Sequence, residues 1–241
     1  MFSESSELYD FIYSEFKDFD AEARDVASLL RRKSPSARRI LDVGCGTGRH
    51  ASALTVEHGF EIDGLDIQPG FLEIARRRCP RGTFYLGDMA DFDLGHCYEA
   101  VICLFSSIGY VKTTDRLAMA ARCMRRHLSD GGVALIEPWF TQDAFEGGSV
   151  YMQTVDREDM KICRVSRSEV RGKISWLEFH YLIGEGQEIR HLREEHELGL
   201  FSHEEMMDGL RAGGFEQVEF DPEGLTGRGL YVASTQDQEG G

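Results

Sequence analysis

The chain has 241 residues, of which 41% are hydrophobic and 29% charged, a balance typical of a globular protein that buries a core without disulfides. Its formal net charge of −15 excludes nucleic acid and anionic membrane surfaces as expected partners. It also repels anionic small molecules at long range, so any such substrate must be held by local arginines.

The six cysteines show no pattern of a disulfide framework or a metal site. No pair has Cys-x-x-Cys spacing, and several lie inside apolar strands, so we interpret them as reduced, mostly buried thiols. No group of His and Cys has metal-ligand spacing, and no metal is expected. The acidic N-terminus shows no apolar signal segment, and no apolar stretch is long enough to span a bilayer. We therefore expect a cytoplasmic protein with no membrane partner, and a homodimer stays open.

The first half of the chain alternates predicted helices with predicted strands. A helix is expected from a cap at Asp20 to Ser34-Pro35, and others through residues 51–56, 71–78 and 117–128. The predicted strands are residues 39–43, 61–66, 83–86, 100–105 and 133–137. Strands that alternate with helices at this spacing predict an α/β fold with a doubly wound parallel sheet.

The pattern changes after Pro138. Residues 150–197 alternate in short runs rich in β-branched and aromatic side chains, with hairpin turns at Gly172 and at residues 184–186. We interpret residues 139–200 as an inserted antiparallel β layer that binds substrate, after a cofactor-binding half at residues 1–138.

A final helix and two strands are expected at residues 201–235, within the same single domain. Ser202 and Glu205 form a capping-box pattern, and Met206, Met207 and Leu210 form the buried stripe of the helix. Residues 215–220 and 229–234 complete the sheet, and the polar tail 236–241 is expected to fray.

The strongest local motif is the glycine-rich turn Asp42-Val43-Gly44-Cys45-Gly46-Thr47-Gly48, which connects a strand to a helix. Glycines allow the backbone to turn sharply and to approach a ligand. The next strand ends at Asp66, whose carboxylate can accept hydrogen bonds from both hydroxyls of a ribose. The motif therefore predicts a nucleoside-containing cofactor at this turn.

The turn has three interpretations: it binds a dinucleotide, it binds the cofactor of class I methyltransferases, or it binds no ligand. A dinucleotide fold requires G-x-G-x-x-G, but the sixth position is Arg49 counted from Gly44 and Ala51 counted from Gly46. The observed spacing, D-x-G-x-G-x-G, matches the first motif of class I methyltransferases, in which the loop lies under the methionine part of S-adenosylmethionine (SAM).

Residues after the third and fourth strands support an adenosyl pocket. Asp88 can accept from the exocyclic amine of adenine, and the backbone of Met89 can meet the ring edge. Leu104, at the end of the fourth strand, can cover the cofactor, because ligands of open α/β sheets bind at these carboxyl ends. A surface turn is the alternative for Asp88 and Met89 taken alone.

Beyond these general motifs, the chain resembles the N,N-dimethyltransferases that act on TDP-linked 3-amino-3,6-dideoxyhexoses, as in the desosamine and mycaminose pathways. The resemblance extends over nearly the whole chain. It is carried by Glu7-Leu8-Tyr9-Asp10 with Tyr13, Lys17-Asp18-Phe19, Gly87-Asp88-Met89-Ala90-Asp91-Phe92, Phe105-Ser106-Ser107-Ile108-Gly109-Tyr110, Glu137-Pro138-Trp139-Phe140, Arg164-Val165-Ser166 and Gly227-Arg228-Gly229-Leu230.

The resemblance implies a class I SAM-methyltransferase (Rossmann-like) fold and a role for each matching residue. The cofactor-binding residues would be Phe19, Gly44, Gly46, Gly48, Asp66, Ile67, Asp88, Met89 and Leu104. Tyr13 and Tyr110 would flank the sugar amine as catalytic residues, with Tyr110 standing where some relatives have His. The nucleotide and its phosphates would be held by Trp139, Phe140, Arg164, Ser166, His180 and Arg228.

Several of these residues have simpler explanations. Arg228 could be a solvated turn residue, Arg164 could form a cross-strand ion pair, Trp139 could be a core residue and His180 a half-buried strand residue. A phenol has a reference pKa of about 10, so Tyr13 and Tyr110 are expected to orient the amine rather than to deprotonate it. We therefore expect the amine to lose its proton to water.

The predicted function is in-line transfer of methyl groups from SAM to the amine of a TDP-linked amino sugar. The alternatives are a methyltransferase for another small metabolite, a non-catalytic SAM-binding module and, disfavoured by the glycine spacing, an NAD-dependent dehydrogenase.

Overall fold

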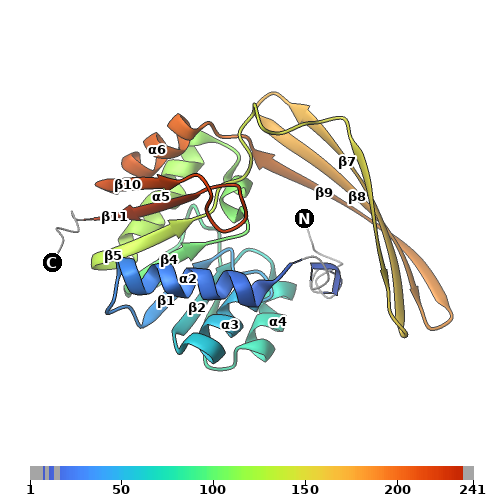
Figure 1. Ribbon diagram of the computed structural model, residues 1–241, viewed down its shortest axis with the longest axis horizontal. Helices are drawn as coiled ribbons and strands as arrows, with labels where there is room; N and C mark the ends of the chain where they lie inside the picture. The colour runs from blue at the N-terminus through green and yellow to red at the C-terminus, as the bar shows by residue number, and fades with distance from the viewer. Residues whose placement is uncertain (1–7, 9–10, 14–16, 236–241) are drawn as a thin grey trace.

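The computed structural model describes residues 8, 11–13 and 17–235 of the chain. Residues 7, 9 and 10 of the N-terminal motif and the polar tail 236–241 lie outside the described residues. Two layers face each other: a seven-stranded sheet covered by helices, and a four-stranded antiparallel sheet beside it (Figure 1).

The larger sheet has the order β10-β11-β5-β4-β1-β2-β3. Neighbours from β5 to β3 run parallel, and β11 is antiparallel to both of its neighbours. Its strands are β1 (Arg39–Val43), β2 (Glu61–Asp66), β3 (Phe84–Leu86), β4 (Tyr98–Cys103), β5 (Leu128–Ile136), β10 (Gln217–Asp221) and β11 (Leu230–Ser234). The chain order reverses between β1 and β4, and the carboxyl ends of strands at such a switch point open a crevice for a ligand.

Helices cover both faces of this sheet, each through an apolar stripe. One face packs against α2 (Phe19–Lys33), α3 (Arg49–His58) and α4 (Pro69–Arg78), and the other against α5 (Thr114–Arg126) and α6 (His203–Ala212). A short 3₁₀ helix, η1 (Ser107–Val111), follows β4 and carries side chains into the crevice.

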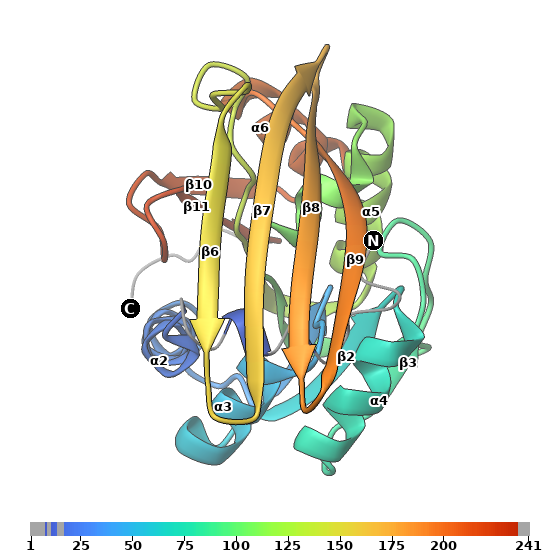
Figure 2. The same cartoon turned by 90° about the vertical axis from the view of Figure 1, so that its right-hand side faces the viewer.

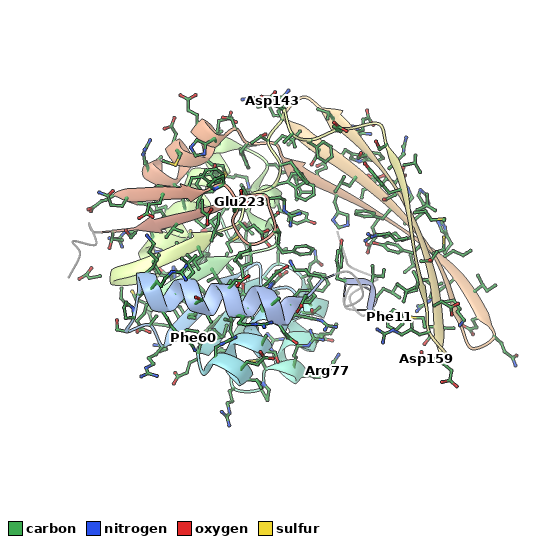
Figure 3. The ribbon with its side chains drawn as sticks, in the orientation of Figure 1. Phe11, Phe60, Arg77, Asp143, Asp159 and Glu223 are labelled. Carbon is green, nitrogen blue, oxygen red and sulfur yellow. The ribbon has the colours of Figure 1, made fainter. Side chains whose placement is uncertain are left out.

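The four-stranded sheet has the order β6-β7-β8-β9 (Figure 2). Its strands are β6 (Val150–Asp156), β7 (Met160–Arg171), β8 (Ile174–Glu185) and β9 (Glu188–Gly199). Its inner face packs against Leu8 and Ile12 through Ile162, Tyr181 and Ile183. Figure 3 places Phe11 in the space between the two layers. Leu8, Phe11 and Ile12 thus cover part of the inner face of the antiparallel sheet.

The predicted doubly wound sheet and inserted antiparallel layer are confirmed, but most predicted boundaries differ by a few residues. The predicted helix 117–128 is α5, Thr114–Arg126, and the predicted strand 100–105 is β4, Tyr98–Cys103. Three further boundaries also differ. Asp18, not Asp20, caps α2, because its side chain accepts from the backbone N–H of Ala21. The helix expected from residue 71 begins at Pro69, since proline at the first helical position needs no N–H partner. The fifth strand begins at Leu128 and contains Gly131 at φ +73°, beside a register shift in its pairing with β4.

Other expectations agree with the structure. The capping box of Ser202 and Glu205 is present at the start of α6. All six cysteines are free, and all but Cys97 and Cys163 are buried. None of the helices in the described part of the chain is long and apolar enough to cross a membrane.

Candidate active site

A cavity of about 240 Å³ lies where the carboxyl ends of the parallel strands meet the antiparallel sheet. One side is formed by the segments that follow β1 to β4, and the other by Leu177, Phe179, His196 and Leu198 of β8 and β9. Side chains from both layers fill the space around it (Figure 3). The cavity therefore joins the predicted cofactor edge to the predicted substrate layer.

The glycine-rich turn forms the floor of the cavity. Gly44 and Gly46 have positive φ angles of +74° and +54°. The backbone N–H groups of Gly44 and Cys45 both donate to the carbonyl of Leu65, at 2.7 and 3.1 Å. A Cβ on Gly44 would lie 2.6 Å from the Cβ of Ser107, so the turn packs closely against η1 and leaves its backbone open to a ligand.

Asp66, at the end of β2, supports this turn and faces the cavity. Its Oδ2 accepts from the N–H of Gly46 and its Oδ1 from the N–H of Gln68, both at 2.8 Å. Burial raises the pKa of Asp66, and these backbone hydrogen bonds oppose the rise. A carboxylate has about four lone-pair positions, so acceptor capacity remains for the two hydroxyls of a ribose.

A second, smaller hollow of about 30 Å³ lies on the other side of the glycine turn, beside Phe19, Arg49 and Leu104. Asp42 lines it, and within the described residues its Oδ2 is buried without a hydrogen-bond partner. Burial, followed by the charge of Asp66, raises the pKa of Asp42 to about 7. A buried carboxylate without a partner is costly, and the ammonium group of a methionyl cofactor would supply one. The residues present therefore fit SAM.

Asp88 and Met89 line the cavity next to Asp66, where the adenine of an adenosyl group would lie. Asp88 Oδ1 accepts from the N–H of Ala90 at 2.9 Å, and Oδ2 pairs with Arg116 at 2.6 Å. Burial opposes ionisation, but the bonds from Ala90 and Arg116 outweigh it and lower the pKa of Asp88. Asp88 is thus an ionised acceptor, as recognition of an exocyclic amine requires.

Aromatic side chains surround the other half of the cavity. The ring of Tyr13 meets Phe105 edge to face, with centroids 5.3 Å apart, and its hydroxyl receives a hydrogen bond from Arg164 at 3.4 Å. The indole N–H of Trp139 donates to Ser175 Oγ at 2.8 Å. These contacts hold the rings of Tyr13 and Trp139 in fixed positions around the space for an acceptor.

Tyr110 joins this wall to the antiparallel sheet. Its hydroxyl lies 2.9 Å from Nδ1 of His196, a residue of β9 that is buried and also lines the cavity. Burial raises the pKa of Tyr110 well above its ordinary value. Tyr110 is therefore a hydrogen-bond donor at neutral pH and not a phenolate.

A cationic cluster lies beside Phe105, outside the main cavity. Nη2 of Arg228 is 3.3 Å from Oε1 of Glu137, which is fully buried, and its guanidinium lies 5.8 Å from the centroids of both Trp139 and Phe140. Among the described residues, Nε of Arg228 is buried and has no partner. The Nε–H group of Arg228 can therefore donate a hydrogen bond to a phosphate oxygen.

Lys17 adds a second cation to this cluster. Its ammonium lies 3.5 Å from the centroid of Phe105 and pairs with Glu22 at 2.9 Å. Burial lowers the pKa of Lys17, which Glu22 opposes, and Glu137 and Arg228 act on it as neighbouring charges.

The structure brings most of the predicted site residues together. Those that line the main cavity are Tyr13, Gly44, Gly46, Asp66, Ile67, Asp88, Met89, Tyr110 and Trp139, and Phe19 and Leu104 line the smaller hollow. Gly48 lines neither; it caps α3 at φ +73°, and a Cβ there would lie 3.0 Å from the Cβ of Ala75. Its place in the motif is explained by the packing of α3 against α4.

Unlike Trp139, the predicted substrate-binding residues of the antiparallel sheet do not line the main cavity. Arg164 is buried under Tyr13 and Phe179, and Ser166 is paired with Phe179 on the inner face; neither lines the cavity. The structure does not bring His180 to the site. It alternates with Phe179 along β8 and so lies on the outer face, with Nδ1 3.0 Å from Nε2 of His191.

Sequence reasoning missed several residues of the site, of which Arg116, Phe179 and His196 line the main cavity. His196 stands in the run Glu194-Glu195-His196-Glu197, which is typical of an exposed strand. The contact of β9 with η1, far away in the sequence, and the ring of Phe179 help to bury His196. Lys17 was part of a motif, but nothing in the sequence indicated its contact with Phe105.

Comparisons with known proteins agree with this geometry. The family model described as a methyltransferase domain matches residues 40–132. The chain is 40% identical over 231 residues, 95% of this chain and 90% of the relative, to the dTDP-3-amino-3,6-dideoxy-alpha-D-glucopyranose N,N-dimethyltransferase of Streptomyces fradiae. It is 37% identical over 228 residues, 94% of this chain and 91% of the relative, to the dTDP-4-amino-2,3,4,6-tetradeoxy-D-glucose N,N-dimethyltransferase of Saccharopolyspora spinosa.

A solved structure is similar over the same extent. The SAM-bound amino pentose methyltransferase CalS10 from Micromonospora echinaspora, which is involved in calicheamicin biosynthesis, superimposes with a TM-score of 0.86 and 36% identity. The match covers 95% of this chain and 97% of CalS10. The glycine turn, Asp66, the cavity and these relatives lead to one assignment: the chain belongs to the family of SAM-dependent N,N-dimethyltransferases of dTDP-linked amino sugars.

Proposed function

We propose that this protein transfers methyl groups from SAM to the 3-amino group of a dTDP-linked 3-amino-3,6-dideoxyhexose, in two successive steps. The observation that carries the proposal is the single cavity that joins an adenosyl site at Gly44, Asp66 and Asp88 to an aromatic acceptor site at Tyr13 and Tyr110. Bound SAM supplies a methyl group on a positively charged sulfur, which is electrophilic without further activation.

The chain's own residues would align the acceptor and exclude water. Holding two reactants in a near-attack geometry can lower a barrier by several kcal/mol, up to about 7–11 in favourable intramolecular cases. Tyr13, which precedes α2, and Tyr110, from η1, both line the cavity, and we assign them the orientation of the amine. Asp66 and Asp88 would hold the adenosyl group through its ribose and its adenine.

We assign the nucleotide diphosphate to the cluster of Arg228 and Lys17. Trp139 and Phe140 lie against the Arg228 guanidinium and would border the thymine or the sugar. The buried Nε of Arg228, unpartnered in the described part of the chain, supports an anionic ligand. Arg164 lies against Tyr13 and Phe179, Ser166 is paired with Phe179, and His180 lies on the outer face of the sheet. None of the three lines the cavity or belongs to the cluster around Arg228, so we leave them out of the proposed binding set.

The proposal is tested by incubating the purified protein with SAM and dTDP-linked sugars that carry the amine at position 3 or at position 4. We expect turnover of the 3-amino sugar and a monomethyl product at early times, because the cofactor must be exchanged between the two transfers. Preference for the 4-amino sugar would overturn the assigned amine position. Absence of methylation of either sugar would overturn the substrate class.

Arg228→Gln tests the phosphate site. Gln can still donate to Glu137 but carries no charge, so we expect KM for the nucleotide sugar to rise by roughly 10- to 100-fold, the effect of losing one charge-assisted hydrogen bond. Arg211→Gln, on exposed α6, is the matched control. An unchanged KM in Arg228→Gln would favour a substrate without a phosphate group.

A further inference from the structure

A buried polar chain runs from the acceptor side of the cavity into the antiparallel sheet. Tyr110 lies 2.9 Å from Nδ1 of His196, and Nε2 of the same ring lies 3.8 Å from Oε2 of Glu194. The exposed fractions of His196 and Glu194 are 2% and 7%. Polar groups are costly to bury, so an arrangement that includes a histidine and a carboxylate needs an explanation beyond packing.

We assign the proton of the neutral His196 ring to Nε2. The Glu194 carboxyl oxygen Oε2 lies 3.8 Å from this nitrogen, beyond hydrogen-bond distance, and a carboxylate there favours a proton on Nε2 over one on Nδ1. Nδ1 is then a bare acceptor directed at the hydroxyl of Tyr110. This is the orientation in which a histidine can accept a proton delivered through the tyrosine.

The proposed reaction requires such an acceptor. An amino sugar is mostly an ammonium ion at neutral pH and has no lone pair for the methyl group until it loses a proton. Tyr110 cannot act alone, because burial raises its pKa and disfavours the phenolate. The same need recurs before the second methyl transfer.

We propose that His196 accepts the proton of the substrate ammonium through Tyr110, a role that rests on the proposed function. The proton passes from the substrate nitrogen to Oη of Tyr110 while the phenolic proton passes to Nδ1 of His196. The nitrogen keeps the electron pair of the broken N–H bond and can then attack the methyl group. Glu194 faces the imidazolium, which returns its proton to water when the product leaves. In this step His196 does not contact the substrate nitrogen and acts only through Tyr110.

The surroundings of His196 favour its neutral form before the substrate binds. Burial lowers its pKa, Glu194 opposes this, and the charge of Arg164 on β7 adds to the lowering. Among the described residues, the charged or titratable groups that face it include Tyr110 from η1, Glu194 from its own strand and Arg164. A base that is neutral at pH 7 and sits in the site can accept a proton there.

His196→Gln tests the relay, because Gln keeps an acceptor for Tyr110 but cannot take up a proton. We expect kcat at pH 7 to fall by roughly 100-fold, within the usual range for loss of a general base. We expect activity to recover as the pH approaches 9, where the amine is neutral without help. A purely structural role would instead lower kcat equally at every pH, and an unchanged pH profile would overturn the proposal.

Two further variants sharpen the test. Tyr110→Phe breaks the link to an intact histidine, so its pH profile should shift in the same way, and the double variant should be no worse than either single one. His191→Gln, on the outer face of the same strand, is the control and should keep the wild-type profile. Additive losses in the double variant would contradict a relay.

A measurement without turnover separates this proposal from the proposed function. In the protein labelled with ¹⁵N-histidine and bound to S-adenosylhomocysteine, the His196 signals should report a neutral ring protonated at Nε2 at pH 7. A doubly protonated ring would overturn the relay whatever the substrate. Absence of methylation combined with the expected tautomer would overturn the proposed substrate and still support the hydrogen bond from Tyr110 to Nδ1 of His196.

Discussion

At the scale of single residues, burial without an internal partner marks where a ligand is needed. Asp42 and Asp66 lie at the ends of neighbouring strands, and the pKa of Asp42 is raised by burial and by the charge of Asp66. Asp66 compensates with two backbone hydrogen bonds, whereas Oδ2 of Asp42 has none within the described residues. Beside the glycine turn, the carboxylate of Asp66 therefore has hydrogen-bond partners within the protein, whereas that of Asp42 can accept a hydrogen bond from a cationic ligand.

The Asp42 carboxyl predicts a proton release when the cofactor binds. With a pKa of about 7, roughly half of this group is protonated at pH 7, and a bound ammonium ion would ionise it. Calorimetry of SAM binding in buffers of different ionisation enthalpy should therefore show release of about half a proton. Asp42→Asn should abolish this release, and Asp63→Asn, on the next strand, should not. Release that persists in Asp42→Asn would contradict the assignment.

The same group gives a stability prediction for the protein without ligands. Its folded pKa lies above the unfolded value of about 3.9, so the folded state binds more protons between these values and loses stability as the pH rises from about 4 to 7. Asp42→Asn removes this loss, so the melting temperature of the variant relative to wild type should increase across that window. A difference that stays constant from pH 4 to 8 would argue against it.

Tyr13 is expected to orient the amine and not to deprotonate it. Tyr13→Phe removes the hydroxyl that accepts from Arg164 at 3.4 Å but keeps the ring against Phe105. We expect kcat to fall by about three- to tenfold, a loss of about 1 kcal/mol. Tyr151→Phe on exposed β6 is the control. Complete loss of turnover with both ligands still bound would identify Tyr13 as an obligatory base.

At the scale of elements, the sequence predicted the boundary of a helix or strand correctly where neighbouring residues determine that boundary. The predicted strand at residues 61–66 coincides with β2, and Gly59 ends α3 at φ +78°. A predicted boundary was wrong where another residue caps the helix. Asp18 caps α2, because its side chain accepts from the N–H of Ala21, and the helix therefore starts earlier than expected. The sequence showed the alternation of side chains in the antiparallel strands but not which face is buried. His196 is therefore a buried residue that the sequence did not indicate, and His180 lies outside the site as a strand residue.

The start of α6 offers a test of one element alone. Ser202 Oγ accepts from the N–H of Glu205 at 3.1 Å, and Glu205 Oε2 accepts from the N–H of Ser202 at 2.9 Å. Ser202→Ala should destabilise the protein by about 1 kcal/mol in urea unfolding. Glu204→Gln, in the same first turn but outside the box, should change the free energy of unfolding by less than about half of that. Equal losses of stability in the two variants would mean that the negative charge of the first turn, and not the capping hydrogen bonds, stabilises the start of α6.

At the scale of the whole molecule, the site depends on the contact between two layers that have separate hydrophobic clusters. The cofactor side is built entirely on the larger sheet, and the acceptor side combines it with β8 and β9. Under the proposed function, Arg228 and Lys17 beside Phe105 would hold an anionic substrate against the net charge of −15, although they also pair with Glu137 and Glu22.

Ligand binding should stabilise the folded molecule in a way that distinguishes the cofactor. S-Adenosylhomocysteine at 100 times its Kd should add about 2.7 kcal/mol to the free energy of unfolding and raise the melting temperature. NAD at the same concentration should have no effect, because the turn lacks the G-x-G-x-x-G spacing for a pyrophosphate. Stabilisation by NAD alone would reverse the assignment of the cofactor.

The sequence by itself determined the order of helices and strands, the glycine turn and the carboxylate of Asp66, because each is encoded by neighbouring residues or by a fixed spacing. Only the tertiary structure decided which faces of the antiparallel sheet are buried, and hence that Tyr110 meets His196, 86 positions away. That contact depends on how β9 packs against η1, and burial created by distant packing leaves no local signal in the chain.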